Sequence, residues 1–250
     1  MDFTFGIITF NNIENINKII DSIEIQNIPN YEIIIVGCNK TFNLTTLNKL
    51  KRKNCSCIPF DESIYSAWIT KKKNLITQNA KYENIVYMHD YIILEDNWYS
   101  GYLEYGNKFD VIINPIKNLD GTRFRDWVLN IHFLRGLYLI TENRTKPIIN
   151  ARDKWIQKYV NIIISRRYDI DPSSQCYFLD YNNDGKEWQE YIYISGAYWV
   201  AKKHVMEEFP LNENLLWLQS EDIEWCQRVR NKYIFSCNKN SVCKFIKQKD

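Results

Sequence analysis

The sequence has 250 residues, of which 45% are hydrophobic and 25% charged, a balance that excludes a disordered chain and allows one large globular core. With 32 Lys and Arg residues against 30 Asp and Glu residues, the net charge of +2 argues against nucleic acid as the main partner. The 7 cysteines show neither C-x-x-C pairs nor a dense framework, so we interpret them as reduced thiols.

The start of the sequence enters a strand-like run directly, without the charged and apolar regions of a signal peptide. Nowhere do about 18 apolar residues follow one another, the length that a membrane-spanning helix needs. We therefore expect a cytoplasmic protein without a transmembrane segment.

The first segments alternate between strand and helix patterns. Phe3–Phe10 is apolar and rich in β-branched residues, which predicts a strand. Asn11 and Asn12 can cap the helix that follows, because Ile13–Ile23 repeats isoleucine at helical spacing. A Pro-Asn break precedes a second strand, Tyr31–Val36. Two strands that flank one helix predict a parallel βαβ unit with a right-handed crossover.

Three more elements precede the centre of the chain. Thr41–Lys53 is predicted to be a helix, Cys57–Phe60 a short strand, and Ala67–Asn79 a helix with three successive lysines. We expect Lys71 and Lys72 to belong to a solvated basic face, the usual place for such a run. The alternation predicts an α/β fold with a mostly parallel central sheet flanked by helices, which binds ligands at the carboxyl ends of its strands.

The next strand, Ile85–Met88, ends at His89 and Asp90, where the expected ligand site lies. A carboxylate in that place can hold Mg²⁺ or Mn²⁺ against a pyrophosphate, since hard oxygen ligands suit these cations. The alternative is a buried strand that ends in a solvated turn.

Residues 117–189 are predicted to form an inserted helical segment, with a helix over Ile148–Ile164. Gly121–Trp127 places two guanidinium groups and an indole together, a combination suited to phosphate and sugar contacts. The alternative is an ordinary helix start in which Asp120 caps and Trp127 is buried. We expect His132 to be a core or interface residue rather than a ligand.

An acidic cluster follows Ser220, which we expect to cap a helix. Glu221, Asp222 and Glu224 fill the first turn of that helix, and we expect Arg228 to pair with one of its carboxylates. Such an acidic first turn is also how an ordinary helix begins, so the cluster alone indicates no function.

Five segments, taken in order, resemble motifs of GT-A glycosyltransferases, especially the family 2-like group. They are Thr9-Phe10-Asn11, similar to P-T-Y-N; Lys73-Asn74, similar to Arg-Asn; Met88-His89-Asp90-Tyr91, similar to Leu-Asp-Asp-Asp; Ile194–Lys203, similar to G-G-A-x-x-x-x-R; and Glu221–Glu224, similar to E-D-x-D/E. The resemblance implies a single GT-A-like domain over residues 1–250, with a nucleotide-sugar-binding half, 1–115, and an acceptor-binding half, 116–250.

The resemblance also implies an activity, the inverting transfer of a sugar from a nucleotide-diphosphate donor, a UDP-sugar above all, to a hydroxyl of a glycan or other acceptor. Asp222 would be the general base, with Glu221 orienting the acceptor or sharing that role, and Asp90 with His89 would hold Mn²⁺ or Mg²⁺. The implied donor-binding residues are Thr9, Phe10, Asn11, Asn39, Lys73 and Asp90. The implied acceptor-binding residues are Gly196, Ala197, Tyr198, Trp217 and Glu224.

The sequence departs from the family pattern in two places. After the second strand Asn39 is the only polar substitute for the family's base-binding Asp, and the aspartate motif is reduced to one carboxylate, Asp90. A catalytically inactive nucleotide- or sugar-binding protein of the same fold is therefore the alternative. A sugar-nucleotide nucleotidyltransferase is a weaker one, because such enzymes open with a Gly-rich loop and Gly6 is the only glycine there.

Overall fold

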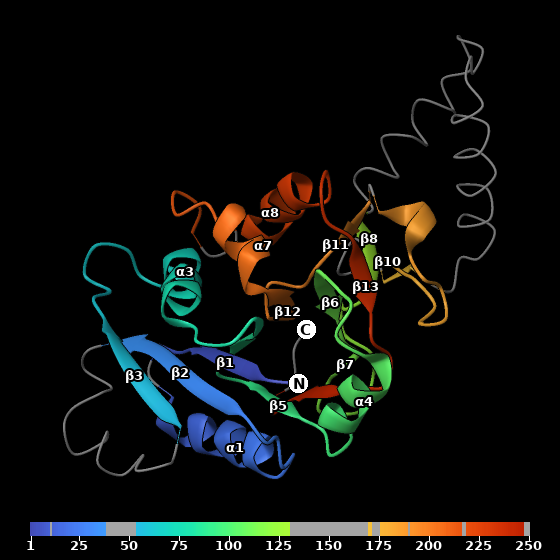
Figure 1. Ribbon diagram of the computed structural model, residues 1–250. Helices are drawn as coiled ribbons and strands as arrows, with labels where there is room; N and C mark the ends of the chain where they lie inside the picture. Colours follow the sequence, from blue (N-terminus) through green and yellow to red (C-terminus); the bar gives the residue numbers. More distant parts are fainter. Residues whose placement is uncertain are drawn as a thin grey trace.

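The computed structural model describes residues 1–10, 12–38, 54–130, 170–171, 176–189, 191–216 and 219–247. At its centre lies a seven-stranded sheet with the strand order β13-β6-β12-β4-β1-β2-β3 (Figure 1). In that order the strands are Phe235–Cys237, Val111–Ile113, Tyr198–Lys202, Asn84–His89, Phe3–Ile8, Tyr31–Cys38 and Cys55–Phe60.

The central sheet is mostly parallel, as the alternation of elements predicts. Strand β1 pairs in parallel with both β2 and β4, β2 with β3, and β6 with β13. Only β12 runs antiparallel to its two neighbours, β4 and β6. The carboxyl ends of β1 and β4 and the beginning of β12 therefore lie together at one end of the strands.

Helices cover both faces of this sheet (Figure 1). They are α1 (Ile13–Glu24), α3 (Ile69–Asn79), α4 (Trp98–Tyr105), α7 (Lys203–Glu208) and α8 (Glu221–Val229). Because successive strand residues point to opposite faces, Ile33 and Ile35 of β2 join the core under α1 and α4, whereas Ile34 and Val36 join the core under α3, α7 and α8. No helix of the described residues is long and apolar enough to cross a membrane.

Two smaller sheets and a short helix complete the described part of the chain. One sheet has the order β5-β14-β7, with strands Ile92–Leu94, Cys243–Phe245 and Ile116–Lys117. The other has the order β11-β8-β10-β9, with strands Ile192–Tyr193, Val128–Asn130, Cys176–Phe178 and Ile170–Asp171. A 3₁₀ turn spans Lys186–Trp188.

Helix α1 forms as its sequence pattern predicts. The side chain of Asn12 accepts a hydrogen bond from the backbone N–H of Asn15 at 3.1 Å, which satisfies one of the free donors at the helix start. Four isoleucines at helical spacing, Ile16, Ile19, Ile20 and Ile23, are buried against the sheet.

The predicted helix start at Gly121–Trp127 is wrong. Asp120 Oδ1 instead closes a turn by accepting from the backbone N–H of Thr122 at 2.9 Å, and Arg123 forms a bridge with Lys117. Arg123 also pairs with the buried carboxylate of Asp126 at 2.8 Å. Trp127 is buried, as expected. Thr41–Lys53, Ile148–Ile164 and His132 lie outside the described residues.

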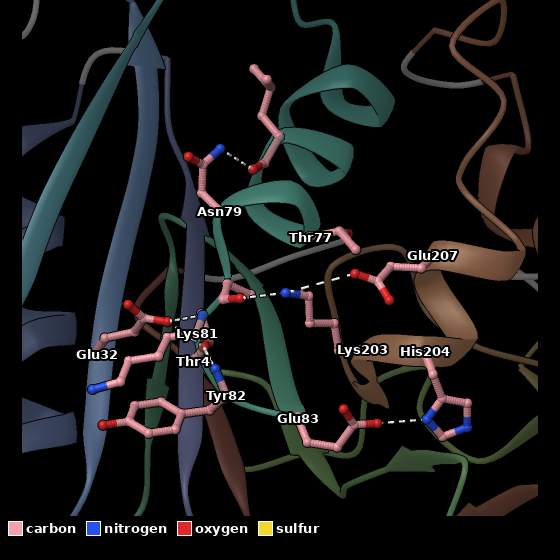
Figure 2. Close-up of polar contacts among 12 residues, drawn as sticks. Thr4, Glu32, Thr77, Asn79, Lys81, Tyr82, Glu83, Lys203, His204 and Glu207 are labelled. Carbon is pink, nitrogen blue, oxygen red and sulfur yellow. Dashed lines mark hydrogen bonds and ion pairs between the residues drawn. The ribbon is translucent and has the colours of Figure 1, made fainter.

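Polar contacts fix the end of the sheet at which β4 begins (Figure 2). Thr4 Oγ1 donates to Glu32 Oε1 at 2.7 Å, and Lys203 Nζ donates to the carbonyl of Ala80 at 2.7 Å. His204 contacts Glu83 at 2.5 Å between Nδ1 and Oε1. His204 thus lies beside the residue before β4, at the opposite end of that strand from His89.

Gly6 in β1 lets α3 pack closely on the sheet, since a Cβ there would lie 2.3 Å from Cγ2 of Ile76. We predict that Gly6→Ala lowers the free energy of unfolding by about 1–3 kcal/mol, the cost of overpacking a core. Urea unfolding measures this loss. In Gly6→Ala/Ile76→Ala the combined loss should be smaller than the sum of the two single losses, and strict additivity would contradict the proposed clash.

Candidate functional site

The candidate site begins where β1 and β4 end. These strands pair Ile8 with His89, so Thr9 and Asp90 are the next residues on neighbouring strands. Thr9 Oγ1 donates a hydrogen bond to Asp90 Oδ2 at 2.7 Å, which joins two residues that are 81 positions apart. The structure therefore brings Thr9, His89 and Asp90 together at the sheet edge where the sequence predicts a ligand site.

A pocket of about 210 Å³ opens at this edge. Its lining residues are Ile8, Thr9, Phe10, Ala67, Ile69, Lys72, His89, Asp90, Tyr91 and Lys247. Phe10 is 53% exposed and therefore offers an aromatic ring at the pocket. Four residues that the sequence pointed to, Thr9, Phe10, His89 and Asp90, thus share one pocket.

Lys72 is a pocket residue that the sequence prediction missed, since we expected it on a solvated face. Its side chain is buried, with the residue only 2% exposed, and Nζ donates to the carbonyl of Thr9 at 2.9 Å while it pairs with Glu62. Successive helix residues point about 100° apart, so three lysines in a row reach three different surroundings. Lys71 remains half-exposed beside Glu213, Lys72 faces the pocket, and Lys73 faces β12.

Ala67, which precedes α3 and lines the pocket, has a strained backbone conformation. Ala67 has a φ of 54°, in the left-handed region that residues with a Cβ rarely adopt. Its backbone N–H donates to Glu62 Oε2 at 2.7 Å, and the other oxygen of Glu62 pairs with Lys72. One carboxylate therefore fixes both the strained turn and the buried ammonium group, an arrangement often seen at functional sites.

A second set of polar contacts joins Gly196, just before β12, to the first turn of α8. The backbone N–H of Gly196 donates to Asp222 Oδ2 at 2.9 Å, and the carbonyl of Gly196 accepts from Lys73 Nζ at 2.6 Å. A Cβ on Gly196 would lie 2.9 Å from Glu221 Oε1 and 3.1 Å from Asp222 Oδ2, so both carboxylates lie close against this turn. The two segments that resemble the acceptor-side motifs are thus in direct contact.

Helix α8 does not begin with the predicted cap. Ser220 makes no side-chain capping bond, and its φ of 58° places it in the left-handed region. The backbone strain at Ser220 directly precedes Glu221 and Asp222. Both carboxylates stand in the first turn, where the helix dipole favours negative charge.

Burial and charge act against each other in this group. Burial raises the pKa of Glu221, the ammonium group of Lys73 lowers it, and the nearby Asp222 raises it further. Burial lowers the pKa of Lys73 to about 8, and the negative charges of Glu221 and Asp222 oppose that shift. The three side chains therefore form one electrostatic unit.

The pocket and the carboxylate group adjoin each other. The backbone N–H of His89 donates to the carbonyl of Ala197 at 3.1 Å, next to Gly196. Burial raises the pKa of the Tyr91 hydroxyl, and the charges of Asp90 and Glu221 both raise it further. Tyr91 lines the pocket, so Asp90, which follows β4, and Glu221 of α8 act on one pocket hydroxyl.

Two of the residues implied as acceptor-binding have other partners. Tyr198 is 0% exposed and its hydroxyl donates to Asn114 Oδ1 at 3.0 Å in the core under α1 and α4, so its side chain is not open to an acceptor. Alternate residues of β12 point to opposite faces of the sheet, so Tyr198 lies on the face opposite to the one that α8 covers. Glu224 pairs with Arg228 at 2.6 Å, which confirms the expected role of Arg228.

The remaining implied residues divide between the core and the undescribed part of the chain. Ala197 is buried, and its carbonyl joins β4 as described above. Asn11, Asn39 and Trp217 lie outside the described residues.

The described residues offer a sparse set of metal donors. No three His, Cys, Asp or Glu side chains among them are grouped closely enough to hold a metal ion. Asp90 has one oxygen engaged by Thr9, and Oδ1 accepts no hydrogen bond from the described part of the chain. Such a donor set fits a cation like Mg²⁺ that is held by one carboxylate, with water and phosphate oxygens as the other ligands.

Comparison with solved structures identifies the fold. The chain is similar to crystal structures of S. aureus TarS 1-349, with TM-scores of 0.55 at 13% identity for the protein alone, 0.57 at 11% for the complex with UDP, and 0.56 at 12% for the complex with UDP-GlcNAc. TarS is a GT-A-type glycosyltransferase. The described architecture is therefore a GT-A glycosyltransferase fold, as the sequence motifs predict.

The likeness covers 98% to 100% of this chain, and the chain spans 60% of the length of these TarS chains. No protein family model matches the sequence, and no curated protein matches it either. At this level of identity the likeness establishes the fold and leaves the chemistry to be argued from the site.

Ser220 provides a direct test of the start of α8. Glycine has no Cβ to strain in the left-handed region, so we predict that Ser220→Gly is about 1 kcal/mol more stable than Ser220→Ala in denaturant unfolding. Ser220→Ala should stay within about 0.5 kcal/mol of the parent, because no side-chain cap is lost. A loss of about 1 kcal/mol or more in Ser220→Ala relative to the parent would instead indicate a true capping residue.

Proposed function

We propose that this protein is a glycosyltransferase that transfers a sugar from a nucleotide diphosphate to an acceptor hydroxyl. One observation carries the proposal. A pocket at the ends of β1 and β4, lined by Asp90 and Lys72, adjoins the Gly196 turn, which contacts Glu221 and Asp222. Diphosphate binding needs the first group, and deprotonation of an acceptor needs the second. Solved TarS complexes contain UDP and UDP-GlcNAc, which supports a UDP-sugar as the donor class.

The donor would lie in the pocket at the end of β4. Phe10 presents an exposed ring against which a nucleotide base can stack. Lys72 uses two of its three ammonium donors on Thr9 and Glu62, so the third is available for a phosphate oxygen. Asp90, with help from His89, would hold Mn²⁺ or Mg²⁺ at the diphosphate, and that cation would offset the charge of the leaving group.

The acceptor would approach from the side of α8. Asp222 accepts the proton of the attacking hydroxyl while the bond from the sugar to the diphosphate breaks and the bond to the acceptor oxygen forms, with inversion at the sugar carbon. The N–H groups of Gly196 and Ile223 each donate to one oxygen of Asp222, which fixes the orientation of the carboxylate. Each carboxylate oxygen has a second lone pair, so an acceptor hydroxyl can still bind there.

A catalytically inactive binding protein of the same fold is the second candidate, because Asp90 is the only carboxylate lining the described pocket. One experiment separates the two functions: purified protein is incubated with a panel of nucleotide sugars, with and without Mn²⁺, and free nucleoside diphosphate is measured. The proposal predicts release of the diphosphate that increases when a hydroxyl acceptor is supplied. Tight binding without release from any donor would support the second candidate and reject the first.

Asp90→Asn tests the donor end of the site. The amide keeps the size of the side chain and its contact with Thr9 but loses the charge that holds a cation. We predict that the variant keeps the parental melting temperature and loses Mn²⁺-dependent UDP binding, measured by calorimetry. Parental affinity for UDP together with Mn²⁺ in this variant would remove Asp90 from the metal site.

Asp222→Asn tests the acceptor end. We predict that kcat falls by roughly 10²-fold or more with donor affinity little changed, because an amide cannot accept the proton. Glu207→Gln, a surface change on α7 beside Lys203, is the control and should keep the parental kcat (Figure 2).

Glu221 and Glu224 are the competing carboxylates at the acceptor end. If Asp222→Asn keeps the parental kcat while Glu221→Gln or Glu224→Gln loses it, the base is that other residue. If all three variants stay active, the cluster is only the start of a helix and the proposed mechanism is wrong.

A further inference from the structure

Lys73 is a buried cation with no part in the donor chemistry proposed above. The residue is 1% exposed, and it does not line the pocket that Lys72 enters. Its Nζ donates to the carbonyl of Gly196 at 2.6 Å and lies 4.4 Å from the ring centroid of Trp199. Its contacts are therefore with the start of β12, on the acceptor side.

Removal of an ammonium group from water costs several kcal/mol unless nearby groups compensate it. One carbonyl and one indole face compensate only part of this cost. Among the described residues, the charged groups that act on Lys73 are Glu221 and Asp222, both from α8, while β12 presents the neutral ring of Trp199. The stability of Lys73 in its charged form thus depends on the carboxylates that the proposed reaction uses.

The backbone of Gly196 links Lys73 to Asp222. Its carbonyl accepts from Lys73, and its N–H donates to Asp222 Oδ2 at 2.9 Å. The absence of a side chain lets Glu221 approach the same turn. A shift of the Gly196 turn would therefore move the hydrogen bond that orients Asp222.

We propose that Lys73 is a positioning residue, whose ammonium group holds the Gly196 turn and balances Glu221, so that Asp222 stays hydrogen-bonded to Gly196. This inference rests on the proposed function, because the role of Asp222 as base belongs to it. It assigns Lys73 to the orientation of the base rather than to the donor, where the sequence resemblance puts it.

A pH dependence follows from the position of Lys73. Its pKa is lowered to about 8 by burial, so the ammonium form prevails below that pH and is lost above it. Activity that needs the charged lysine should therefore be full on the acid side of pH 8 and fall on the alkaline side. In Lys73→Met this alkaline fall should be absent, since the titrating group is gone.

Lys73→Met is the test variant, and Lys71→Met is its matched control, because Lys71 belongs to the same helix but lies half-exposed beside Glu213. We predict that kcat of Lys73→Met falls at least about 10-fold, since small displacements of a catalytic group have large effects on rate. The UDP dissociation constant should change by less than about twofold, which a donor ligand would not permit. The melting temperature should fall below the parental value, since removal of one partner leaves the buried carboxylate of Glu221 without its counter-charge.

Amide hydrogen exchange at Gly196 provides a readout that requires no turnover. We expect faster exchange of this N–H in Lys73→Met than in the parent and in Lys71→Met, because its partner Asp222 is less well held. A loss of UDP affinity in step with kcat would instead assign Lys73 to the donor. If Lys73→Met keeps the parental kcat, pH profile and Gly196 exchange rate, Lys73 is only a packing residue and the proposal is wrong. If the parent itself transfers no sugar, the proposed function fails, and the exchange rate of Gly196 still decides whether Lys73 holds this turn.

Discussion

Two buried ammonium groups on one helix are the constraint on which the rest of the site depends. Lys72 and Lys73 are adjacent on α3 and nearly inaccessible, so each must find compensation within the protein. Lys72 finds it at Glu62 and the carbonyl of Thr9, and Lys73 at Gly196 and the carboxylates of α8. Because α3 holds both groups, it fixes the end of β1 and the start of β12 relative to each other.

The glycines of the fold make this placement of α3 possible. Gly6 lets the helix pack closely on β1, with Ile76 against the strand backbone. Gly196 lets the first turn of α8 approach the beginning of β12 from the other side. The positions of the two lysines are therefore a consequence of backbone packing as much as of charge. The strained residues Ala67 and Ser220 flank these contacts and indicate that the local geometry is held by its surroundings.

Much of the fold was predictable from the sequence, because strands β1, β2 and β4 are rich in apolar and β-branched residues and α1 repeats isoleucine behind a capping Asn12. The meeting of Asp90 with Thr9 followed from the geometry of parallel strands. The direction of individual side chains did not follow. Nothing in a run of three lysines tells which one faces a pocket, and only the register of β12 shows that Tyr198 points away from α8. The left-handed backbone conformation of Ser220 could not be predicted either, since serine favours a capping role that Ser220 does not take.

We propose that a nucleotide sugar lies between the end of β4 and the start of α8. A crystal structure of the protein soaked with a nonhydrolysable UDP-sugar and Mn²⁺ tests it most directly. We expect the diphosphate within reach of Asp90 and Lys72, with the sugar directed toward Asp222 and Gly196. A nucleotide sugar bound away from the ends of β1 and β4, or with its sugar directed away from α8, would contradict it.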